Sequence, residues 1–280
     1  FGYKGYLQDK KLLKKIFSKH KPKVIIHLAA QAGVRYSIDN PLSYVDSNLI
    51  GTFHVLEIAR EFQPCHLLMA STSSVYGSNK DMPLHENQKC DTPMSFYAAT
   101  KKSNEIMAHS YSHLYSIPIT MFRFFTVYGP WGRPDMALFK FTKNIILGKP
   151  IDIYNKGNMI RDFTYITDLV SAIFLLTPKI PVKNQQKKIT FKNDSLSDVA
   201  PFRIVNIGNS KPIKLLNLIE KLEKVLSIKA EKKFLGMQQG DVYKTHSNIE
   251  LLEGLIGPQT KTSIDQGLSE FVKWYKSYYI

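Results

Sequence analysis

The segment that decides the fold reads S-T-S-S-V-Y-G at residues 71–77 and F-Y-A-A-T-K at residues 96–101. An apolar run at residues 66–70 precedes the first motif and predicts a strand that ends in a loop of hydroxyl side chains. The second motif lies at the start of residues 95–115, whose apolar spacing predicts a helix. The segment therefore predicts a strand, a loop and a helix, with reactive side chains gathered between the strand and the helix.

Tyr97 and Lys101 are the first candidates for chemistry, because side chains four apart share one face of a helix. An ammonium beside a phenol favours the phenolate, so this spacing predicts a lowered pKa for Tyr97 and a role as general base. The same spacing begins at Tyr6 and at Tyr76 without supporting motifs. The pair alone is therefore a weak signal, and the hydroxyl loop before the helix strengthens it.

Strands and helices alternate through the first half of the chain. Apolar runs at 24–30, 65–70 and 118–124 predict strands, and the segments 41–62 and 95–115 between them predict helices. Strands that are apolar on both faces and alternate with helices indicate a doubly wound parallel sheet of the α/β class, covered on both faces. Ligands bind beyond the carboxyl ends of such strands, so we expect one crevice there.

The second half alternates less regularly and predicts a smaller α+β domain that binds substrate. A polar stretch at 183–198 predicts a solvated loop. We assign residues 1–126 and 160–180 to the sheet domain, and residues 127–159 and 181–280 to the smaller domain. The elements expected in this half are strands at 151–154, 161–165 and 202–206 and helices at 136–147, 167–177, 212–226, 249–255 and 264–278.

The net charge of +15 does not by itself indicate a nucleic-acid partner. The lysines are scattered, only six of the 38 basic residues are Arg, and no nucleic-acid motif accompanies them. Two cysteines are too few for a disulfide framework, and no apolar run is long enough to cross a bilayer, so we expect a cytoplasmic protein without a membrane partner. His109 and His113 lack a third ligand in the pattern, and we expect no metal site.

The chain begins with Phe1 and reaches a helix-like segment, residues 10–19, before its first strand. A dinucleotide-binding sheet is expected to open with a strand, a Gly-rich turn and a helix. Gly2 and Gly5 form a G-x-x-G fragment with no strand before it. We therefore expect an N-terminally incomplete chain that lacks the first βα unit; a natural protein with a degenerate N-terminus is the alternative.

Five ordered motifs cover most of the chain. They are H-L-A-A-Q-A-G-V-R-Y-S at 27–37, S-T-S-S-V-Y-G at 71–77, Y-x-x-x-K at 97–101, R-F-F-T-V-Y-G-P-W-G-R-P-D-M-A at 123–137 and G-N-M-I-R-D-F-T-Y-I at 157–166. Together they resemble the extended short-chain dehydrogenases/reductases that modify nucleotide sugars, and among these the UDP-glucuronate 4-epimerases. The resemblance implies a Rossmann-like fold and a homodimer formed through the helices at 41–62 and 95–115.

The resemblance also implies NAD as cofactor, which oxidises C4 of a UDP-linked sugar and returns the hydride to the other face. In this scheme Tyr97 removes the C4 hydroxyl proton, Lys101 lowers the Tyr97 pKa and bonds the nicotinamide ribose, and Thr72 positions the same hydroxyl. Ser73 and Ser74 are the alternatives to Thr72. The implied cofactor contacts are Leu7, Leu28, Ala29, Ala30, Asn48, Tyr97, Lys101 and Phe124.

Substrate contacts follow from the same resemblance. Related dehydratases and decarboxylases carry acidic residues where this chain has Ser73 and Ser74, so the carboxylate base for C5 chemistry is absent. Arg133 matches the position that grips a sugar carboxylate, and Thr126 adds a hydrogen bond to that group; the alternative is a loop ion pair between Arg133 and Asp135. The implied substrate contacts are Arg35, Ser73, Thr126, Arg133, Arg161, Arg203 and Asp241.

These observations predict an NAD-dependent enzyme that converts UDP-glucuronate to UDP-galacturonate for surface polysaccharide synthesis. The expected partners are the UDP-sugar and a second copy of the chain. Two alternatives remain open. One is a neutral UDP-hexose 4-epimerase, and the other is a non-catalytic scaffold without a Gly-rich cofactor cradle.

Overall fold

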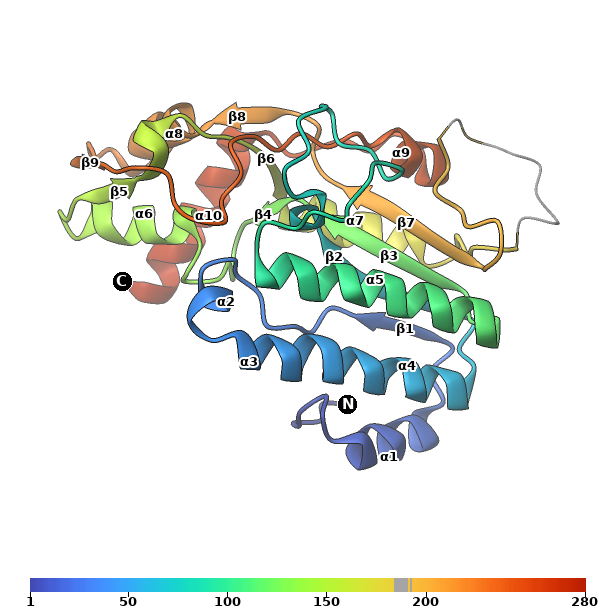
Figure 1. The fold of residues 1–280 in the computed structure, drawn as a ribbon. Helices are drawn as coiled ribbons and strands as arrows, with labels where there is room; N and C mark the ends of the chain where they lie inside the picture. The colour runs from blue at the N-terminus through green and yellow to red at the C-terminus, as the bar shows by residue number, and fades with distance from the viewer. Residues whose placement is uncertain (184–190, 192) are drawn as a thin grey trace.

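A four-stranded parallel sheet forms the centre of the larger part of the molecule. The computed structural model describes residues 1–183, 191 and 193–280. All neighbouring strands of this sheet pair in parallel, so their carboxyl ends meet at one edge. In spatial order the strands are β1 (Val24–His27), β2 (His66–Thr72), β3 (Ile119–Phe124) and β7 (Phe202–Ile207) (Figure 1).

Helices cover both faces of this sheet (Figure 1). On one face, α4 (Gly51–Phe62) and α5 (Phe96–Tyr115) bury an apolar cluster against β1, β2 and β3. On the other face, α7 (Ile166–Leu176) and α9 (Glu250–Ile256) bury a second cluster, mainly over β3 and β7. The predicted doubly wound α/β class is confirmed. An outer helix, α1 (Lys10–His20), packs against α4.

The predicted helix at 41–62 is continuous but not uniform. It begins with α3 (Pro41–Tyr44), passes through the π-helical turns of η1 (Val45–Ile50) and continues as α4. Pro41 suits the first helical position, because its missing N–H would have no partner there. The π-helical segment carries the buried Asn48, and such segments are often found at functional sites.

The edge strand β1 departs from the predicted pattern. Val24 and Ile26 are 41% and 44% exposed, although the sequence predicted a strand covered on both faces. The reason is its place in the sheet: β1 lies at the edge, and the described helices of the second face, α7 and α9, pack mainly over β3 and β7.

The smaller part of the molecule contains two short sheets and three helices around one apolar cluster. The strands β4, β6 and β8 form the first sheet, and β5 pairs with β9. Two single turns, η2 and η3, and the short helix α2 complete the described elements. The bounds are α2 (Tyr36–Asp39), η2 (Ser73–Tyr76), β4 (Thr126–Tyr128), α6 (Ala137–Ile146), β5 (Ile151–Ile153), η3 (Tyr154–Gly157), β6 (Ile160–Tyr165), β8 (Pro212–Lys214), α8 (Leu215–Leu226), β9 (Lys232–Phe234) and α10 (Ile264–Tyr279).

Four assignments for the second half are wrong. The helix α9, expected in the smaller domain, packs on the central sheet. The strand β7, expected in the smaller domain, pairs with β3 in the central sheet. The strand β6, expected in the sheet domain, pairs with β4 and β8. Residues 212–214 form β8 rather than the start of a helix. The chain passes between the two parts several times, and sequence order alone does not reveal such crossings. The predicted loop at 183–198 falls partly on 184–190 and 192, outside the described residues.

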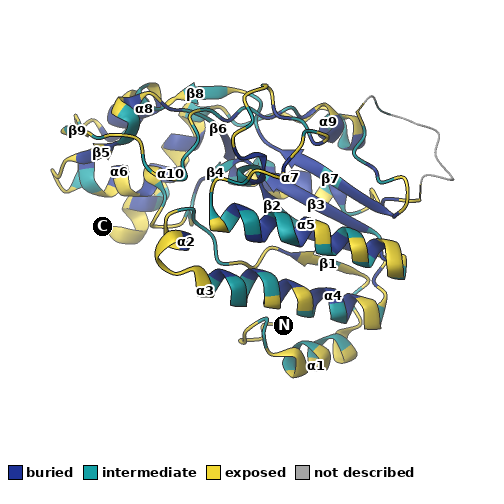
Figure 2. Cartoon of the chain, in the orientation of Figure 1, coloured by how far each residue is buried: buried dark blue, intermediate teal, exposed yellow. Residues whose placement is uncertain are grey.

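Burial follows this layered arrangement. Figure 2 shows the buried strands β3 and β7 at the centre, the more exposed edge strand β1, and exposed residues along the outer sides of α1, α4 and α5. Over the described ranges, no helix has both the length and the apolar character needed to span a membrane.

Candidate active site

Thr72 and Tyr97 meet at the carboxyl edge of the central sheet. Thr72 ends β2, and its hydroxyl caps η2 by accepting a hydrogen bond from the Ser74 amide at 3.2 Å. Ser95 caps α5 in the same way, which places Tyr97 in the first turn of that helix. The Tyr97 phenol makes a side-chain hydrogen bond with Thr72. The structure therefore brings these two residues together, with Ser73 in the adjoining turn.

The pKa of Tyr97 is raised above its ordinary value, because the phenol is buried. The hydrogen bond with Thr72 and the positive charge of Arg133 oppose this rise without reversing it. The prediction that Lys101 would lower the Tyr97 pKa is wrong for the structure described, since burial outweighs the neighbouring charges. Burial therefore disfavours the phenolate of Tyr97 in the structure described.

Lys101 lies one turn further along α5 and is only 3% exposed. Burial lowers its pKa to about 8, and the Glu105 carboxylate opposes that shift. The pKa of His27 is lowered to about 4 by burial and by the charge of Lys101, so the imidazole is neutral. Within the described part of the chain, no hydrogen bond involves the Lys101 ammonium. Its three N–H donors remain available for hydroxyls of a ligand.

Asn48 joins the loop after β1 to the helix that carries Tyr97. Its side chain accepts from the Gln31 amide at 2.8 Å and donates to the Gln31 carbonyl at 3.0 Å. It also donates to the Thr100 hydroxyl at 3.0 Å, and Thr100 donates to the Tyr97 carbonyl at 2.8 Å. Asn48 is fully buried. This network fixes the backbone of Tyr97 relative to the carboxyl end of β1.

Arg133 reaches the same group from the loop between β4 and α6. Its Nε donates to Asp135 Oδ1 at 2.9 Å, and its Nη2 donates to Asp135 Oδ2. The charge of Arg133 acts on the phenols of Tyr97 and Tyr44. Tyr44 packs edge-on against Tyr97, with ring centroids 6.0 Å apart. Arg133 therefore lies at the rim of the Tyr97 site, and the alternative pairing with Asp135 is present in the structure.

Arg35, Arg161 and Asp241 form a second group. The Arg35 guanidinium lies 3.7 Å from an Asp241 oxygen and 4.7 Å from the centre of the Tyr154 ring. Arg161 donates to the Tyr243 carbonyl at 3.0 Å. Burial lowers the Arg161 pKa, and the charge of Asp241 opposes this. Two guanidinium groups near one carboxylate leave a net positive charge, which suits an anion such as a diphosphate.

Arg203 joins neither group. It is the second residue of β7 and stands in register with Thr120 near the amino end of β3. Its side chain bonds to Asp194 at 3.0 and 3.1 Å. Because Tyr97 and Thr72 lie at the carboxyl edge, the prediction that Arg203 contacts substrate is wrong. The expectation for Arg203 came from a short motif, which does not show at which end of a strand its residues lie. The strand register places Arg203 at the amino end of β7.

The other residues predicted to contact cofactor or substrate lie at the carboxyl ends of strands, at the start of β4 or near α4. Residues 28–30 follow β1 and are exposed. Phe124 ends β3 in register with Thr72, and Thr126 begins β4 two residues later. Leu7 packs near Gly51 at the start of α4.

These residues fit the nicotinamide riboside half of NAD. The exposed, mainly small side chains of residues 28–30 permit close approach of a flat ring, and the Lys101 ammonium suits ribose hydroxyls. The described segment before α1 contains Gly2 and Gly5 but no strand. It therefore offers no strand–turn–helix cradle for the pyrophosphate.

A buried polar network lies beneath the site, and sequence reasoning missed it. Its members, the floor network, are Ser71, Tyr76, Glu86, Glu105, Arg123 and Asn206. Arg123 donates from Nε and Nη2 to the two Glu105 oxygens, both at 2.9 Å. Ser71 donates to Glu105 at 2.7 Å. The sequence contained one indication of the role of Glu105: it follows Lys101 by four residues and therefore shares a helix face with it.

The other members of the floor network, Tyr76, Glu86 and Asn206, come from three segments that are distant in sequence. The Arg123 guanidinium lies 4.7 Å from the centre of the Tyr76 ring, and the Tyr76 hydroxyl donates to Asn206 at 2.7 Å. The Asn206 amide donates to Glu86 at 2.8 Å. Burial raises the pKa of Glu86 to about 7. The network therefore contains a carboxyl group that titrates near neutral pH.

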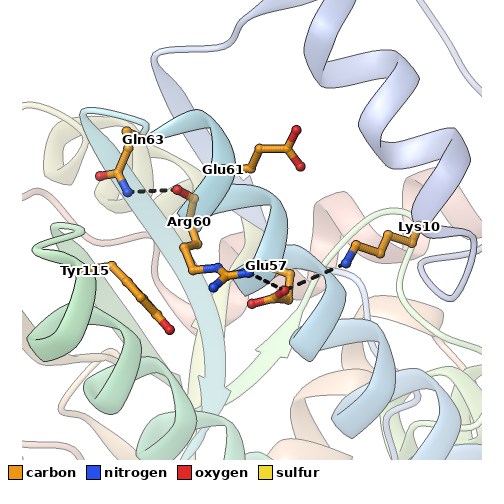
Figure 3. Close-up of a pocket in the computed structure, with 6 residues that line it drawn as sticks. All are labelled: Lys10, Glu57, Arg60, Glu61, Gln63 and Tyr115. Carbon is orange, nitrogen blue, oxygen red and sulfur yellow. Dashed lines mark hydrogen bonds and ion pairs between the residues drawn. The ribbon is translucent and has the colours of Figure 1, made fainter.

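A surface hollow of about 420 Å³ lies between α1 and the carboxyl ends of α4 and α5 (Figure 3). Its charged side chains already have partners: Glu57 lies 3.8 Å from Lys10 and 2.9 Å from Arg60. The Gln63 amide donates to the Arg60 carbonyl at 2.9 Å. Tyr97 stands at the opposite end of α5. This hollow is therefore not part of the candidate active site.

The chain is similar in sequence to curated proteins over nearly its whole length. It is 51% identical over 273 residues to the probable UDP-glucuronate 4-epimerase of Rhizobium meliloti, a match that covers 98% of this chain and 80% of the relative. It is 49% identical over 267 residues to the protein CapI of Staphylococcus aureus, with 95% and 80% covered.

Structural similarity points to the same group. The fold matches the crystal structure of UDP-glucuronic acid 4-epimerase from Bacillus cereus in complex with UDP-glucuronic acid and NAD, with a TM-score of 0.82 and 31% identity. The match covers 95% of this chain and 79% of that one. The family model described as "NAD dependent epimerase/dehydratase family" matches residues 2–189. The chain therefore belongs to the NAD-dependent epimerase/dehydratase family.

Proposed function

We propose that the chain is an NAD-dependent 4-epimerase that interconverts UDP-glucuronate and UDP-galacturonate. The observation that carries this proposal is the Arg133 guanidinium at the rim of the site, close enough for its charge to act on Tyr97. A guanidinium in this place suits a sugar that bears a carboxylate, whereas a neutral hexose offers it no anionic partner. The names of the relatives from Rhizobium meliloti and Bacillus cereus support the same substrate.

Tyr97 is the general base of this proposal, and Thr72 holds the same substrate hydroxyl. When bound, NAD supplies the acceptor for the C4 hydride and later its donor. The hydrogen bond with Thr72 and the charge of Arg133 both favour the Tyr97 phenolate and oppose the effect of burial. The phenol therefore releases its proton back to the C4 oxygen once the hydride returns.

Arg133 has a second task in this proposal. Oxidation at C4 of a glucuronate produces a β-keto acid, which loses carbon dioxide when its carboxylate can align with the carbonyl. A guanidinium that holds the carboxylate by directed hydrogen bonds restricts that alignment. In this proposal Thr126, at the start of β4, adds a hydrogen bond from its hydroxyl to the same carboxylate. Ser73 and Ser74 provide no carboxylate base for chemistry at C5.

The two parts of the molecule divide the substrate between them in this proposal. The part built on the central sheet, with β7 included, carries Tyr97 and Lys101 on α5 and the nicotinamide side. The smaller part, with β6 included, contributes Arg161 and Asp241, and Arg35 meets them from the loop after β1. The diphosphate of the UDP-sugar is expected to bind Arg35 and Arg161 in place of Asp241.

The proposal extends to the oligomeric state of the protein, its cellular location and the use of its product. Exposed apolar side chains on the outer faces of α4 and α5, including Phe53, Ile106 and Leu114, support a homodimer formed through these helices. A cytoplasmic location agrees with a substrate and a cofactor that are both nucleotides. UDP-galacturonate would then supply surface polysaccharide synthesis.

The direct test incubates the purified chain with NAD and UDP-glucuronate and separates the nucleotide sugars by chromatography. Formation of UDP-galacturonate is the expected result. Conversion of UDP-glucose but not of UDP-glucuronate would favour the neutral hexose epimerase. No conversion of either sugar would favour the non-catalytic scaffold.

A matched substitution tests the basis of the proposal. Arg133→Ala should reduce kcat/KM for UDP-glucuronate by about 100-fold, because a charge-assisted bidentate contact is lost. The same variant should keep its binding of UDP-glucose within about threefold. Equal losses for both sugars would show that Arg133 does not recognise the carboxylate.

A further inference from the structure

The contact between Arg133 and Asp135 uses only one edge of the guanidinium. Nε donates to Asp135 Oδ1 at 2.9 Å and Nη2 donates to Asp135 Oδ2. An arginine carries five N–H donors, and two of them face Asp135. Within the described residues, no hydrogen bond involves Nη1 of Arg133. The edge formed by Nη1 and Nη2 is therefore still able to bind a second carboxylate.

The surroundings hold this pair between two loops. A Cβ added to Gly33, whose φ is +116°, would lie 3.3 Å from Arg133 Nη2 and 3.6 Å from Asp135 Oδ2. The Tyr44 hydroxyl donates to the Gly33 carbonyl at 2.6 Å, which fixes the first loop. The second loop is anchored by Trp131, whose ring centroid lies 4.9 Å from that of Tyr278 on α10.

We propose that Asp135 is a positioning residue that determines the preference for uronate over neutral sugars. It holds the Arg133 guanidinium by one edge and directs the Nη1 edge at the substrate carboxylate. This inference rests on the proposed function of Arg133. A free arginine side chain would lose conformational freedom when it orders around the substrate. With Asp135 in place, that ordering is already present before binding.

A different role for Asp135, as a competitor of the substrate carboxylate for Arg133, predicts a different result. If Asp135 were only a competitor for Arg133, its removal would strengthen uronate binding, because a negative charge beside the substrate carboxylate would disappear. The half-exposed position of the pair favours the positioning role, since water screens that repulsion, whereas the directed hydrogen bonds persist.

The experiment measures binding of UDP-glucuronate and of UDP-glucose by titration calorimetry, with NAD present, for the parent chain, Asp135→Ala and Asp135→Asn. Asp265→Asn is the matched control, because Asp265 forms an exposed ion pair with Lys221 on the smaller part of the molecule. Asp135→Ala should lower the preference for the uronate over the neutral sugar by about tenfold. Asp135→Asn keeps one acceptor for Nε and should lower it by about threefold.

Product analysis gives a second readout that a purely structural role would not change. In the parent, epimerised product should dominate. In Asp135→Ala, a less ordered carboxylate should lose carbon dioxide from the 4-keto intermediate more often: the C5–C6 bond breaks, its electrons form the enolate at C4, and C5 takes a proton from water. The fraction of UDP-linked 4-ketopentose should therefore rise at least fivefold.

Several results would overturn the inference. They are an unchanged preference in Asp135→Ala, a stronger preference in that variant, equal losses for both sugars, or a parent that binds the uronate no more tightly than UDP-glucose. Binding and turnover separate the two proposals. A parent that binds UDP-glucuronate selectively but does not convert it would refute the proposed function, and the binding ratios would still decide the role of Asp135.

Discussion

Two arginine–carboxylate pairs close to the candidate active site share the same contact through Nε and Nη2 but differ in burial. Arg123 and Glu105 belong to the floor network, and each side chain is 2% exposed. Arg133 and Asp135 lie at the rim, with side chains 43% and 56% exposed. The buried carboxylate also accepts hydrogen bonds from Ser71 and Lys102, whereas the rim guanidinium keeps one edge free.

The comparison shows how burial separates a structural arginine from one that remains able to bind a ligand. A buried ion pair needs all its hydrogen bonds, because an unpaired charge in the interior costs several kcal/mol. A pair at the rim is screened by water and contributes little to stability, so it can exchange partners. The floor pair therefore holds β3 against α5, and the rim pair is the one suited to recognise substrate.

Tyr97→Phe is expected to cause the largest change in activity. It should lower the rate of turnover without changing stability. Removal of the phenol hydroxyl should reduce kcat for UDP-glucuronate by about 10²–10⁴-fold, because the general base is lost. The free energy of unfolding should change by less than about 1 kcal/mol, since the ring and its packing against Tyr44 remain. Steady-state kinetics and urea unfolding measure the two quantities. A variant that unfolds but turns over normally when folded would place Tyr97 with the floor network instead.

Arg123→Ala should produce the largest change in stability. It leaves the Glu105 carboxylate buried without its main partner, at a cost of about 3–5 kcal/mol. Arg133→Ala is the matched control and should cost less than about 1 kcal/mol, because that pair is well exposed. Urea unfolding followed by far-UV circular dichroism compares the two variants. Equal losses of stability would break the distinction between floor and rim.

Glu86→Gln tests the floor network through its pH dependence. The folded pKa of Glu86 is about 7 against an ordinary value of 4.5, so the folded chain binds more protons than the unfolded chain between these values. This carboxyl therefore makes the folded chain less stable as pH rises from 4.5 to 7, by about 3 kcal/mol in total.

The variant lacks this titration, so the parent should lose stability relative to Glu86→Gln as pH rises through that window. Urea unfolding at pH 5 and pH 7 gives the difference between the two chains at each pH. A difference that stays constant would show that Glu86 titrates normally in the folded state.

Lys102→Ala should have the smallest effect. Lys102 is 26% exposed and donates to Glu105 at 3.0 Å, but that carboxylate keeps Arg123 and Ser71 as partners. The expected loss of stability is about 0.2–1 kcal/mol, and it should shrink in high salt. Thermal unfolding with and without added salt measures it. A loss of stability as large as that of Arg123→Ala would mean that the Arg123–Glu105 pair depends on the partly exposed Lys102.

Much of the candidate site was predictable because it depends on spacing within short segments. Tyr97 and Lys101 are one helical turn apart, and Thr72 ends an apolar strand, so their common location at the carboxyl edge could be expected. The floor network was not predictable in this way. Its partners, such as Tyr76 and Asn206, are far apart in sequence and meet only because β7 returns to the central sheet.

The sequence by itself determined the alternation of strands and helices, the helix that aligns Tyr97 with Lys101 and the family resemblance, because these depend on residues within a few positions of one another. Only the tertiary structure decided that Arg203 lies at the wrong end of its strand, that Tyr97 has a raised pKa, and that Arg133 keeps an edge free beside Asp135. Strand register, burial and side-chain pairing arise from contacts between segments distant in the chain, and local patterns do not contain that information.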